Sequence, residues 1–212
     1  MIRVARKGTR FFGTATDLER VQEEYKQNHC VVIRHFLEEG LLADIRGRMD
    51  FASFSPRVDE GIATELCLED PLTLSILTLV LNNQELFDFT QKITGCGRIG
   101  SFSGRAYLFH AKFGHYDSWH DDLIDDRLVA LSINLSSGAY EGGLLQIRER
   151  SSKRVTFEYA NTGFGDALIF QVASNLQHRI TEVMGETPKI AFAGWFKSQP
   201  DFLTLFKNNT VQ

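Results

Sequence analysis

The amino-acid sequence predicts an α+β fold, with helices in its first half and mainly β-strands in its second half. Up to residue 103, apolar side chains recur mostly with the period of an amphipathic helix. From Gly104 onward, short alternating segments are separated by turns that contain Gly and Asn. A chain of 212 residues and 24.0 kDa is long enough to bury the core of one domain. We therefore expect a single domain over 1–212, with a helical buttress in 1–103, a β core in 104–197 and a C-terminal tail in 198–212.

The first helix and the strand after it have separate signals. Residues 16–19 read Thr-Asp-Leu-Glu, which matches a capping box at the start of a helix. Leu18, Val21 and Tyr25 then repeat on one helical face. Residues 30–36 are rich in β-branched side chains and predict the one early strand.

Two further helical regions complete the buttress. Residues 38–50 are amphipathic, so that their apolar side chains share one face. Asp70 followed by Pro71 is typical of a helix start, with an N-cap and then a proline in the first turn. The helical pattern continues to about Thr94, with a break expected at residues 82–83.

The second half reads as strands. Residues 107–113 alternate, as do residues 153–159, and residues 161–163 read as a turn. In the tail, residues 201–207 predict a short helix.

Composition excludes several classes of function. The formal net charge is −4, the pI is about 5.9, and no run of Lys and Arg occurs, which argues against a nucleic-acid partner. The apolar stretch 72–81 is too short to span a bilayer. Three cysteines without a C-x-x-C motif and an N-terminus that does not resemble a secretory signal predict reduced thiols and a cytoplasmic protein. The sequence leaves the oligomeric state open.

A candidate metal site lies in the second half. His120 and Asp122 are two residues apart, so in extended chain both can point at one ion while Asp121 points away. His178 follows 58 residues later in a segment that reads as a strand. Two imidazoles and one carboxylate are the ligand set of a mononuclear non-haem iron site, which leaves coordination positions open for chemistry. Arg127 is interpreted as a residue at the start of a strand rather than as a partner of a carboxylate in the metal loop.

The order of motifs over residues 104–197 resembles the 2-oxoglutarate- and iron(II)-dependent oxygenases, in their prolyl-hydroxylase-like branch. The matching features are the His120-x-Asp122 pair, a strand that ends near Asn134, the Gly142-Gly143 turn, the strand within 163–170, the distal His178, and Lys189 placed six residues before Trp195. Each feature alone is common, and the specificity comes from their order.

This resemblance implies a double-stranded β-helix, which is a jelly-roll-type barrel, with the N-terminal helices against one face. It implies iron(II) held by His120, Asp122 and His178, and 2-oxoglutarate as cosubstrate, with ascorbate as a candidate reductant. Lys189 would pair with the distal carboxylate of 2-oxoglutarate, as a point charge rather than a bidentate fork. The sequence departs from the family where tyrosines often touch the cosubstrate, because Asn134 occupies one such position and His110 or Lys112 another.

For the substrate we expect a small, amino-acid-like metabolite, together with O2 and without a membrane or nucleic-acid partner. The candidate lining residues are Phe102, Tyr107, Trp119 and Arg148, with Arg148 as the partner of a substrate carboxylate. Three alternatives stay open. They are hydroxylation of a protein or peptide side chain, a cupin-like metal enzyme that does not use 2-oxoglutarate, and a non-catalytic module that has kept the barrel.

Overall fold

The computed structural model describes residues 2–111, 113–124 and 126–202. The helices, all in the first half, are α1 (Ala15–Asn28), α2 (Glu39–Met49), α3 (Pro71–Leu81) and α4 (Gln84–Thr94). The strands of this half are β1 (Ile2–Ala5), β2 (Gly8–Phe11), β3 (Cys30–Ile33), β4 (Phe54–Asp59) and β5 (Ala63–Leu68).

The second half is built from strands. They are β6 (Ser101–Phe109), β7 (Tyr116–His120), β8 (Arg127–Asn134), β9 (Glu141–Gly142), β10 (Leu145–Glu149), β11 (Val155–Tyr159), β12 (Ala167–Gln171), β13 (Leu176–Ile180), β14 (Val183–Met184) and β15 (Lys189–Lys197). Most belong to one 11-stranded sheet in the order β11-β10-β13-β7-β5-β6-β15-β8-β12-β3, with β4 paired to β5.

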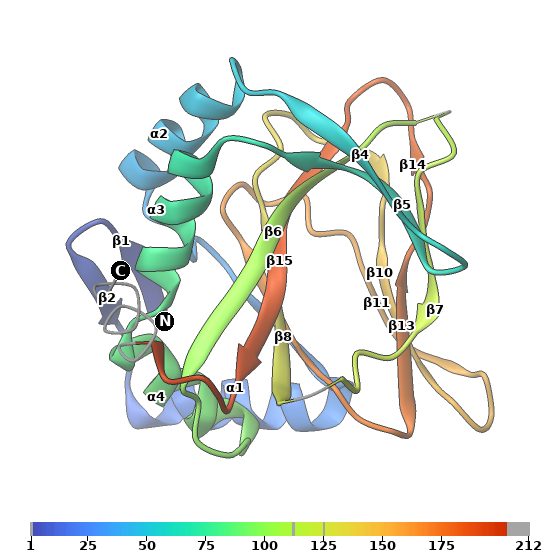
Figure 1. Ribbon diagram of the computed structural model, residues 1–212. Helices are drawn as coiled ribbons and strands as arrows, with labels where there is room; N and C mark the ends of the chain where they lie inside the picture. Colours follow the sequence, from blue (N-terminus) through green and yellow to red (C-terminus); the bar gives the residue numbers. More distant parts are fainter. Residues whose placement is uncertain (1, 112, 125, 203–212) are drawn as a thin grey trace.

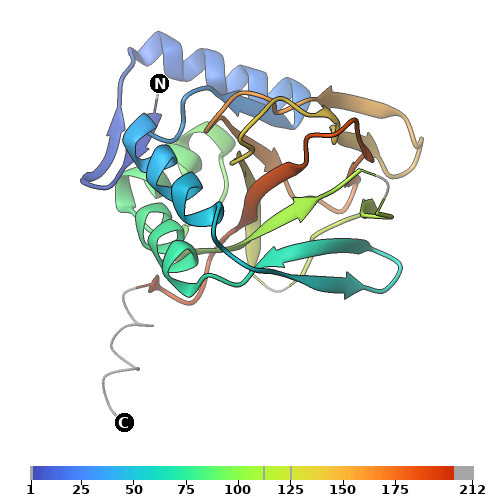
Figure 2. The same cartoon turned by 90° about the horizontal axis from the view of Figure 1, so that it is seen from above.

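This sheet curls into a nearly closed antiparallel barrel of the jelly-roll type, which confirms the predicted fold class (Figure 1). Figures 1 and 2 show α2, α3 and α4 gathered on one side of the barrel, away from β10, β11 and β13, while α1 packs against α4 and β3. The predicted arrangement, with helices supporting a β core, is therefore present.

Strand β6 divides the core into two compartments. Its alternate residues point to opposite faces. Phe102 and Ala106 face the helices and belong to the larger core cluster, where the Phe102 ring lies 5.0 Å from that of Phe196. Tyr107 and Phe109 face the inside of the barrel and belong to a second cluster. The interior of the barrel is thus separate from the core that fastens the helices to it.

The helix boundaries agree with most sequence signals. Asp70 caps α3 with Pro71 in its first turn, and the break at 82–83 separates α3 from α4. The capping box predicted at 16–19 is wrong, because Thr14 caps α1 and exchanges hydrogen bonds with Asp17. Strand β3 ends three residues earlier than predicted, where His35 takes a positive φ of 51° and turns the chain.

Two hairpins of the first half have no counterpart in the sequence-based prediction. They are β1–β2 and β4–β5, and the second joins the barrel through β6 and β7. Its tip is fastened to β7, because the Ser118 amide and hydroxyl donate to the carbonyls of Ile62 and Gly61 at 2.7 and 2.9 Å.

None of the described helices is long and apolar enough to cross a membrane. The short helix predicted at 201–207 falls, from residue 203 onward, outside the described residues.

Candidate active site

The two candidate histidine ligands lie side by side on neighbouring strands. His120 is the last residue of β7, and His178 in the middle of β13 is its direct cross-strand partner. Their ring centroids are 4.3 Å apart. Asp122 follows two residues after the end of β7, and one ligand atom from each of the three residues lies within 4.8 Å of the others. The spacing predicted from sequence is thus realised in space, across 58 residues of chain.

Asp122 is held from two sides. Its Oδ2 accepts a hydrogen bond of 2.7 Å from Nε1 of Trp195, and its Oδ1 accepts one of 3.1 Å from Nη1 of Arg127. The contact with Arg127 corrects the interpretation of that arginine as a residue that only begins a strand. Burial raises the pKa of the Asp122 carboxyl, but the contacts with His178 and Trp195 outweigh burial and lower it to about 2. The carboxylate is therefore ionised at neutral pH, as a metal ligand must be.

His120 is oriented by its other ring nitrogen. Nδ1 lies 2.7 Å from the carbonyl of Ser118 and 3.1 Å from Oδ1 of Asp117, so a proton on Nδ1 has two acceptors. Nε2 is left on the side of Asp122, at 3.7 Å from its Oδ1. Burial lowers the pKa of His120, but the hydrogen bond from its Nδ1 to the Asp117 carboxylate, together with the charge of that group, outweighs burial and raises the pKa to about 9. A carboxylate behind a histidine ligand is a common arrangement in metal sites.

The neighbouring acidic residue is excluded from this cluster. The Asp121 carboxylate forms an ion pair with Arg150 and accepts from the amide of Leu123 at 3.3 Å. Two imidazoles and one carboxylate that converge from a barrel interior fit a mononuclear non-haem iron ion, with coordination positions left for other molecules.

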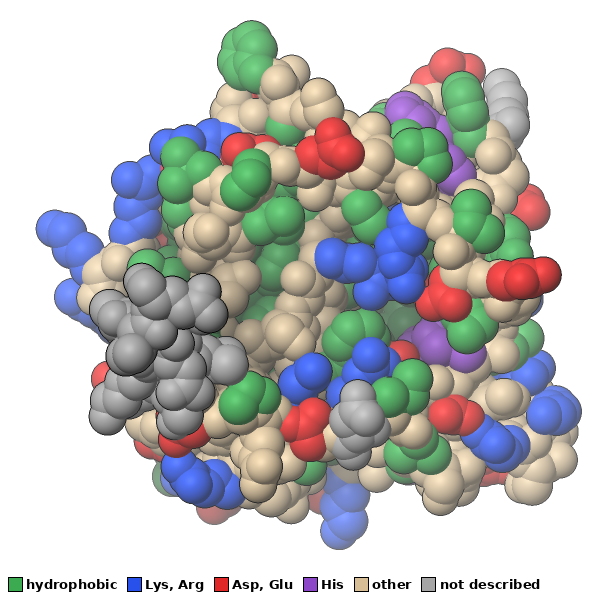
Figure 3. All heavy atoms as spheres, in the orientation of Figure 1, with side chains coloured by type: hydrophobic (Ala, Val, Ile, Leu, Met, Phe, Trp, Pro, Cys, Tyr) green, Lys and Arg blue, Asp and Glu red, His purple; other side chains and the backbone are tan. Residues whose placement is uncertain are grey.

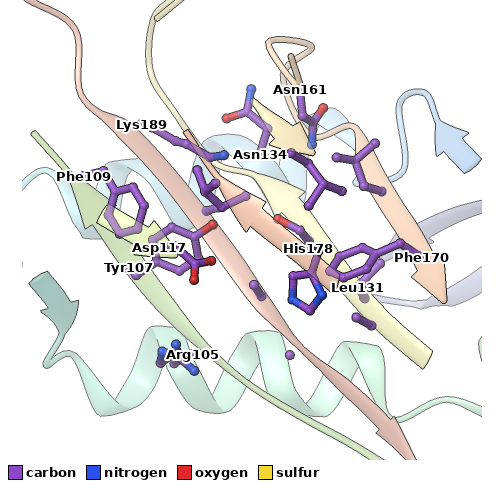
Figure 4. A pocket seen from close by; sticks show the side chains of 18 of the residues that line it. Arg105, Tyr107, Phe109, Asp117, Leu131, Asn134, Asn161, Phe170, His178 and Lys189 are labelled. Atoms are coloured by element: carbon purple, nitrogen blue, oxygen red, sulfur yellow. The ribbon is translucent and has the colours of Figure 1, made fainter. Parts of the chain in front are cut away.

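A cavity inside the barrel surrounds the three residues. Besides them, its polar and aromatic lining consists of Glu65, Arg105, Tyr107, Phe109, Asp117, Ser132, Asn134, Tyr140, Asn161, Phe170, Lys189 and Trp195. Figure 4 shows Lys189 and Asn134 at one end of this cavity and Arg105 at the other, with His178 and Asp117 between them. The metal triad thus separates two polar ends of one cavity.

Lys189 is a buried cation, with 4% of its surface exposed. Its Nζ donates to the carbonyl of Gly143 at 2.6 Å and lies 5.6 Å from the centroid of the Tyr140 ring. Burial lowers the pKa of its amine from 10.5 to about 7. A lysine in this setting lacks a counter-charge, and an anionic ligand would supply one. The cavity end at Lys189 therefore fits a carboxylate.

Asn134 also lies at this end, but its amide already has partners. Nδ2 donates to the carbonyl of Gly163 at 3.0 Å, and Oδ1 accepts from the amide of Ser136 at 3.0 Å. The hydroxyl of Tyr107 is different, because no other described residue forms a hydrogen bond with it. Tyr107, one inward position along β6 from Phe109, is thus a more available contact than Asn134.

Three of the residues proposed as substrate lining lie elsewhere. Phe102 packs among Phe192 and Phe196, because it differs by an odd number of positions from Tyr107 on a regular strand. Trp119 and Arg148 lie next in sequence to the inward residues His120 and Ile147 and so point out of the barrel. There the Arg148 guanidinium stacks on the Trp119 ring at 4.1 Å and bonds Gln177. We correct these three assignments.

Sequence reasoning missed the residues that support the ligands and the far end of the cavity. Glu65 comes from the overlooked hairpin, and residues 63–68, Ala-Thr-Glu-Leu-Cys-Leu, show no regular alternation of apolar and polar side chains that would have predicted the strand. Asp117 and Arg105 carry no motif of their own, so only the fold brings them to the cavity.

Comparison with known proteins agrees with this site. The family model described as the 2OG-Fe(II) oxygenase superfamily matches residues 104–197, which contain all three candidate ligands and Lys189. A search of curated proteins found no match.

Several solved structures share the fold. A prolyl-4-hydroxylase from Pseudomonas putida is 19% identical with a TM-score of 0.63, over 86% of this chain and 99% of that one. A 2OG-Fe(II) oxygenase family oxidoreductase from Burkholderia pseudomallei is 13% identical with a TM-score of 0.66, over 95% and 98% of the two chains. A Trichoplax adhaerens prolyl hydroxylase, in complex with a hypoxia inducible factor peptide fragment, is 13% identical with a TM-score of 0.60, over 88% and 94%.

The ligand geometry, the jelly-roll barrel and the family match point to the same chemistry. Iron(II) and 2-oxoglutarate are the metal and the cosubstrate of this family, and the donor set and the buried lysine fit both of them. Residues 104–197 match the 2OG-Fe(II) oxygenase superfamily, and the chain shares its fold with solved structures that include prolyl hydroxylases.

Proposed function

We propose that this 2-oxoglutarate-dependent dioxygenase hydroxylates an unactivated carbon of a small, amino-acid-like metabolite. The observation that carries the proposal is the cavity itself, in which the His120, Asp122 and His178 triad lies between two charged ends. The volume open to a water-sized sphere is only about 70 Å³. A small and partly charged space suits a small polar molecule better than the uncharged ring of a prolyl side chain.

Each chemical task of the reaction has a residue in this proposal. His120, Asp122 and His178 hold the metal, which together with 2-oxoglutarate and O2 supplies the oxidising chemistry. Lys189 pairs with the distal carboxylate of 2-oxoglutarate, and Tyr107 offers a hydroxyl along the same wall. Trp195 and Arg127 fix the Asp122 carboxylate.

Apolar side chains keep water away from the reacting atoms. Phe109, Leu145 and Phe170 line the cavity from three different strands, and all three are buried. Exclusion of water strengthens the charge pairs at both ends and limits side reactions.

The second candidate is hydroxylation of a side chain on a protein or peptide. This candidate is supported by a structural neighbour, a prolyl hydroxylase in complex with a peptide fragment. Figure 3 shows that the cavity opens into a hollow on the surface, where a peptide could also lie.

Formation of succinate tests the proposal directly. The enzyme, loaded with Fe(II) under anaerobic conditions, is given 2-oxoglutarate, O2 and a panel of free amino acids and small acids. We expect one chemical class of compounds in the panel to raise succinate formation above the uncoupled background. The Asp122→Ala variant should form succinate neither with these compounds nor without them. Stimulation only by a folded protein or a long peptide would replace the first candidate with the second. Absence of any turnover of 2-oxoglutarate would contradict both.

A further inference from the structure

Arg105 lies at the end of the cavity opposite to Lys189. On β6 the inward residues are Arg105, Tyr107 and Phe109, and Phe109 is the cross-strand partner of Lys189 on β15. Arg105 is therefore four residues, or roughly 13 Å along the strand, from the level of Lys189. Figure 4 shows Arg105 and Lys189 apart from each other in the cavity. The two cations serve different ends of the cavity, so Arg105 does not share the anchoring position of Lys189.

The Arg105 side chain is held in place by a buried acid. Its Nε donates to Oε1 of Glu65 at 2.6 Å, and only 2% of the Glu65 side chain is exposed. The same oxygen accepts from Nη1 of Arg57 at 3.0 Å. Two guanidinium groups thus share one carboxylate oxygen. Arg57 is also paired with Asp59 at 3.0 Å, whereas Arg105 pairs with no second acid in the part of the chain that the structure describes.

The outer edge of the Arg105 guanidinium is available to a ligand. Among the residues that the structure describes, neither Nη atom of Arg105 has a hydrogen-bond partner, and about a third of its side chain (35%) is exposed. Figure 3 shows Lys and Arg side chains gathered at the hollow that leads into the barrel. A guanidinium with two free nitrogens presents a fork that matches a carboxylate.

Arg105 is also close to the metal triad. Its guanidinium carbon lies 5.9 Å from the centroid of the Trp195 ring, and the opposite side of this region is occupied by Arg127, whose guanidinium carbon lies 3.6 Å from the same ring. Trp195 in turn donates its hydrogen bond to Asp122. Trp195 thus lies near the Arg105 guanidinium and also contacts the candidate metal ligand Asp122, so a group bound to Arg105 would lie near the metal site.

We propose that Arg105, held by Glu65, binds a carboxylate of the substrate, so that the enzyme acts on a small carboxylic acid such as a free amino acid. This proposal rests on the proposed function. Binding of the substrate carboxylate, which the sequence analysis assigned to Arg148, is here assigned to Arg105, which lines the cavity. An uncharged prolyl side chain would leave the Arg105 fork without a partner.

Matched acids and amides test this assignment. The enzyme is loaded with Mn(II) and saturating 2-oxoglutarate, and its melting temperature is measured against free amino acids and their primary amides, for example L-proline and L-prolinamide. We expect acids to raise the melting temperature, and an amide to need a concentration about 10- to 100-fold higher for the same shift, because it lacks the charge-assisted pair.

Variants separate binding from structural support. Arg105→Gln should remove the preference for acids, and Arg105→Lys should keep part of it, since lysine retains the charge and loses the fork. Arg57→Gln is the matched control, because Arg57 bonds the same Glu65 oxygen without lining the cavity, and the preference should persist. Arg105→Gln takes one partner away from the buried Glu65 carboxylate and so destabilises the fold. If this variant folds poorly, the double variant Arg105→Gln with Glu65→Gln removes both charges and should also lose the preference for acids.

Three results would overturn the proposal. The first is an equal shift in melting temperature with acids and amides, or no shift with acids. The second is an equal loss of the preference for acids in the Arg57 and Arg105 variants. The third is cancellation of the shift with acids by excess 2-oxoglutarate, which would place the acid at Lys189. Uncoupled succinate formation by the wild-type enzyme is measured separately, so that failure of the proposed function is distinguished from failure at Arg105.

Discussion

Trp195 and Asp122 are 73 residues apart in the chain and joined by a hydrogen bond of 2.7 Å, from the indole Nε1 to Oδ2. Trp195 is an inward residue of β15, two positions beyond Ala193, and Asp122 lies in the loop after β7. The bond therefore ties the metal loop to the wall of the barrel. Because Arg127 holds the other oxygen, the carboxylate has little freedom to rotate.

Removal of this indole donor should weaken metal binding. We expect Trp195→Phe to lower the affinity for Mn(II) about 10- to 100-fold, the usual cost of losing a group that orients a metal ligand. Titration calorimetry measures the change. The chain has only one other tryptophan, Trp119, which stacks outside the barrel, so Trp119→Phe is the control and should bind Mn(II) like the wild type. An equal effect of both substitutions would contradict the orienting role of Trp195.

The assignment of the metal ligands predicts an asymmetry between two neighbouring aspartates. His120→Ala, Asp122→Ala and His178→Ala should each abolish iron-dependent turnover, because each removes one of three protein ligands. Asp121→Ala should retain measurable activity, since Asp121 pairs with Arg150 outside the cluster. Iron content and succinate formation are measured together. Similar loss of iron in the Asp121 and Asp122 variants would refute the assignment.

Metal affinity should increase with pH. The pKa of His120 is raised to about 9, so its Nε2 carries a proton at pH 7 that the metal must displace. The apparent affinity for Mn(II) should rise up to about tenfold per pH unit between pH 7 and 9 and level off above, while Asp122, with a pKa of about 2, is ionised throughout. Asp117→Asn removes the negative charge behind His120 and should move the levelling to lower pH. An affinity independent of pH from 7 to 9 would contradict this account.

Binding of 2-oxoglutarate should depend on the charge of Lys189. Lys189→Met keeps the length of the side chain and removes its charge, so the apparent KM for 2-oxoglutarate should rise about 10- to 150-fold, as expected for loss of a charge-assisted pair. Because the pKa of Lys189 in the free protein is about 7, binding of the dianion above that pH requires the Lys189 amine to take up a proton, and the wild-type affinity should fall as pH rises beyond 7. An unchanged KM would place the anchoring role elsewhere.

The same substitution should stabilise the free protein. The pKa of the Lys189 amine is 10.5 ordinarily and about 7 in the fold, so the unfolded chain binds a proton between these values that the folded chain does not. Wild-type stability should therefore increase with pH from 7 to 10.5. Lys189→Met lacks this dependence, so its higher melting temperature should be most evident at or below pH 7 and should fade toward pH 10.5. A variant less stable than the wild type at pH 7 would contradict the cost assigned to the buried amine.

Local pattern in the sequence was sufficient for the helical first half, the strand-rich second half and the His120-x-Asp122 pair of the candidate metal site. Helices α3 and α4 have a cap, a first-turn proline and a break that depend only on neighbouring residues, and the His120-x-Asp122 spacing brings two ligands together because they are close in the chain. The choice of His178 and Lys189 needed the order of motifs along the second half. The helix caps and the His120-x-Asp122 pair could be predicted because each depends on one short segment, whereas His178 and Lys189 could be chosen only from their order relative to the other motifs.

The tertiary structure alone decided which side chains face the cavity. Phe102 and Tyr107 looked equivalent in sequence, but strand pairing sends one to the helices and the other to the interior. Glu65 and Arg105 are 40 residues apart in the chain and form a hydrogen bond. They meet because the β4–β5 hairpin pairs with β6 and β7 beside the site. Asp117 and Trp195 support the ligands through contacts that no local pattern records. A side chain's face depends on register and on the partners of its strand, and those are set by packing of the whole barrel.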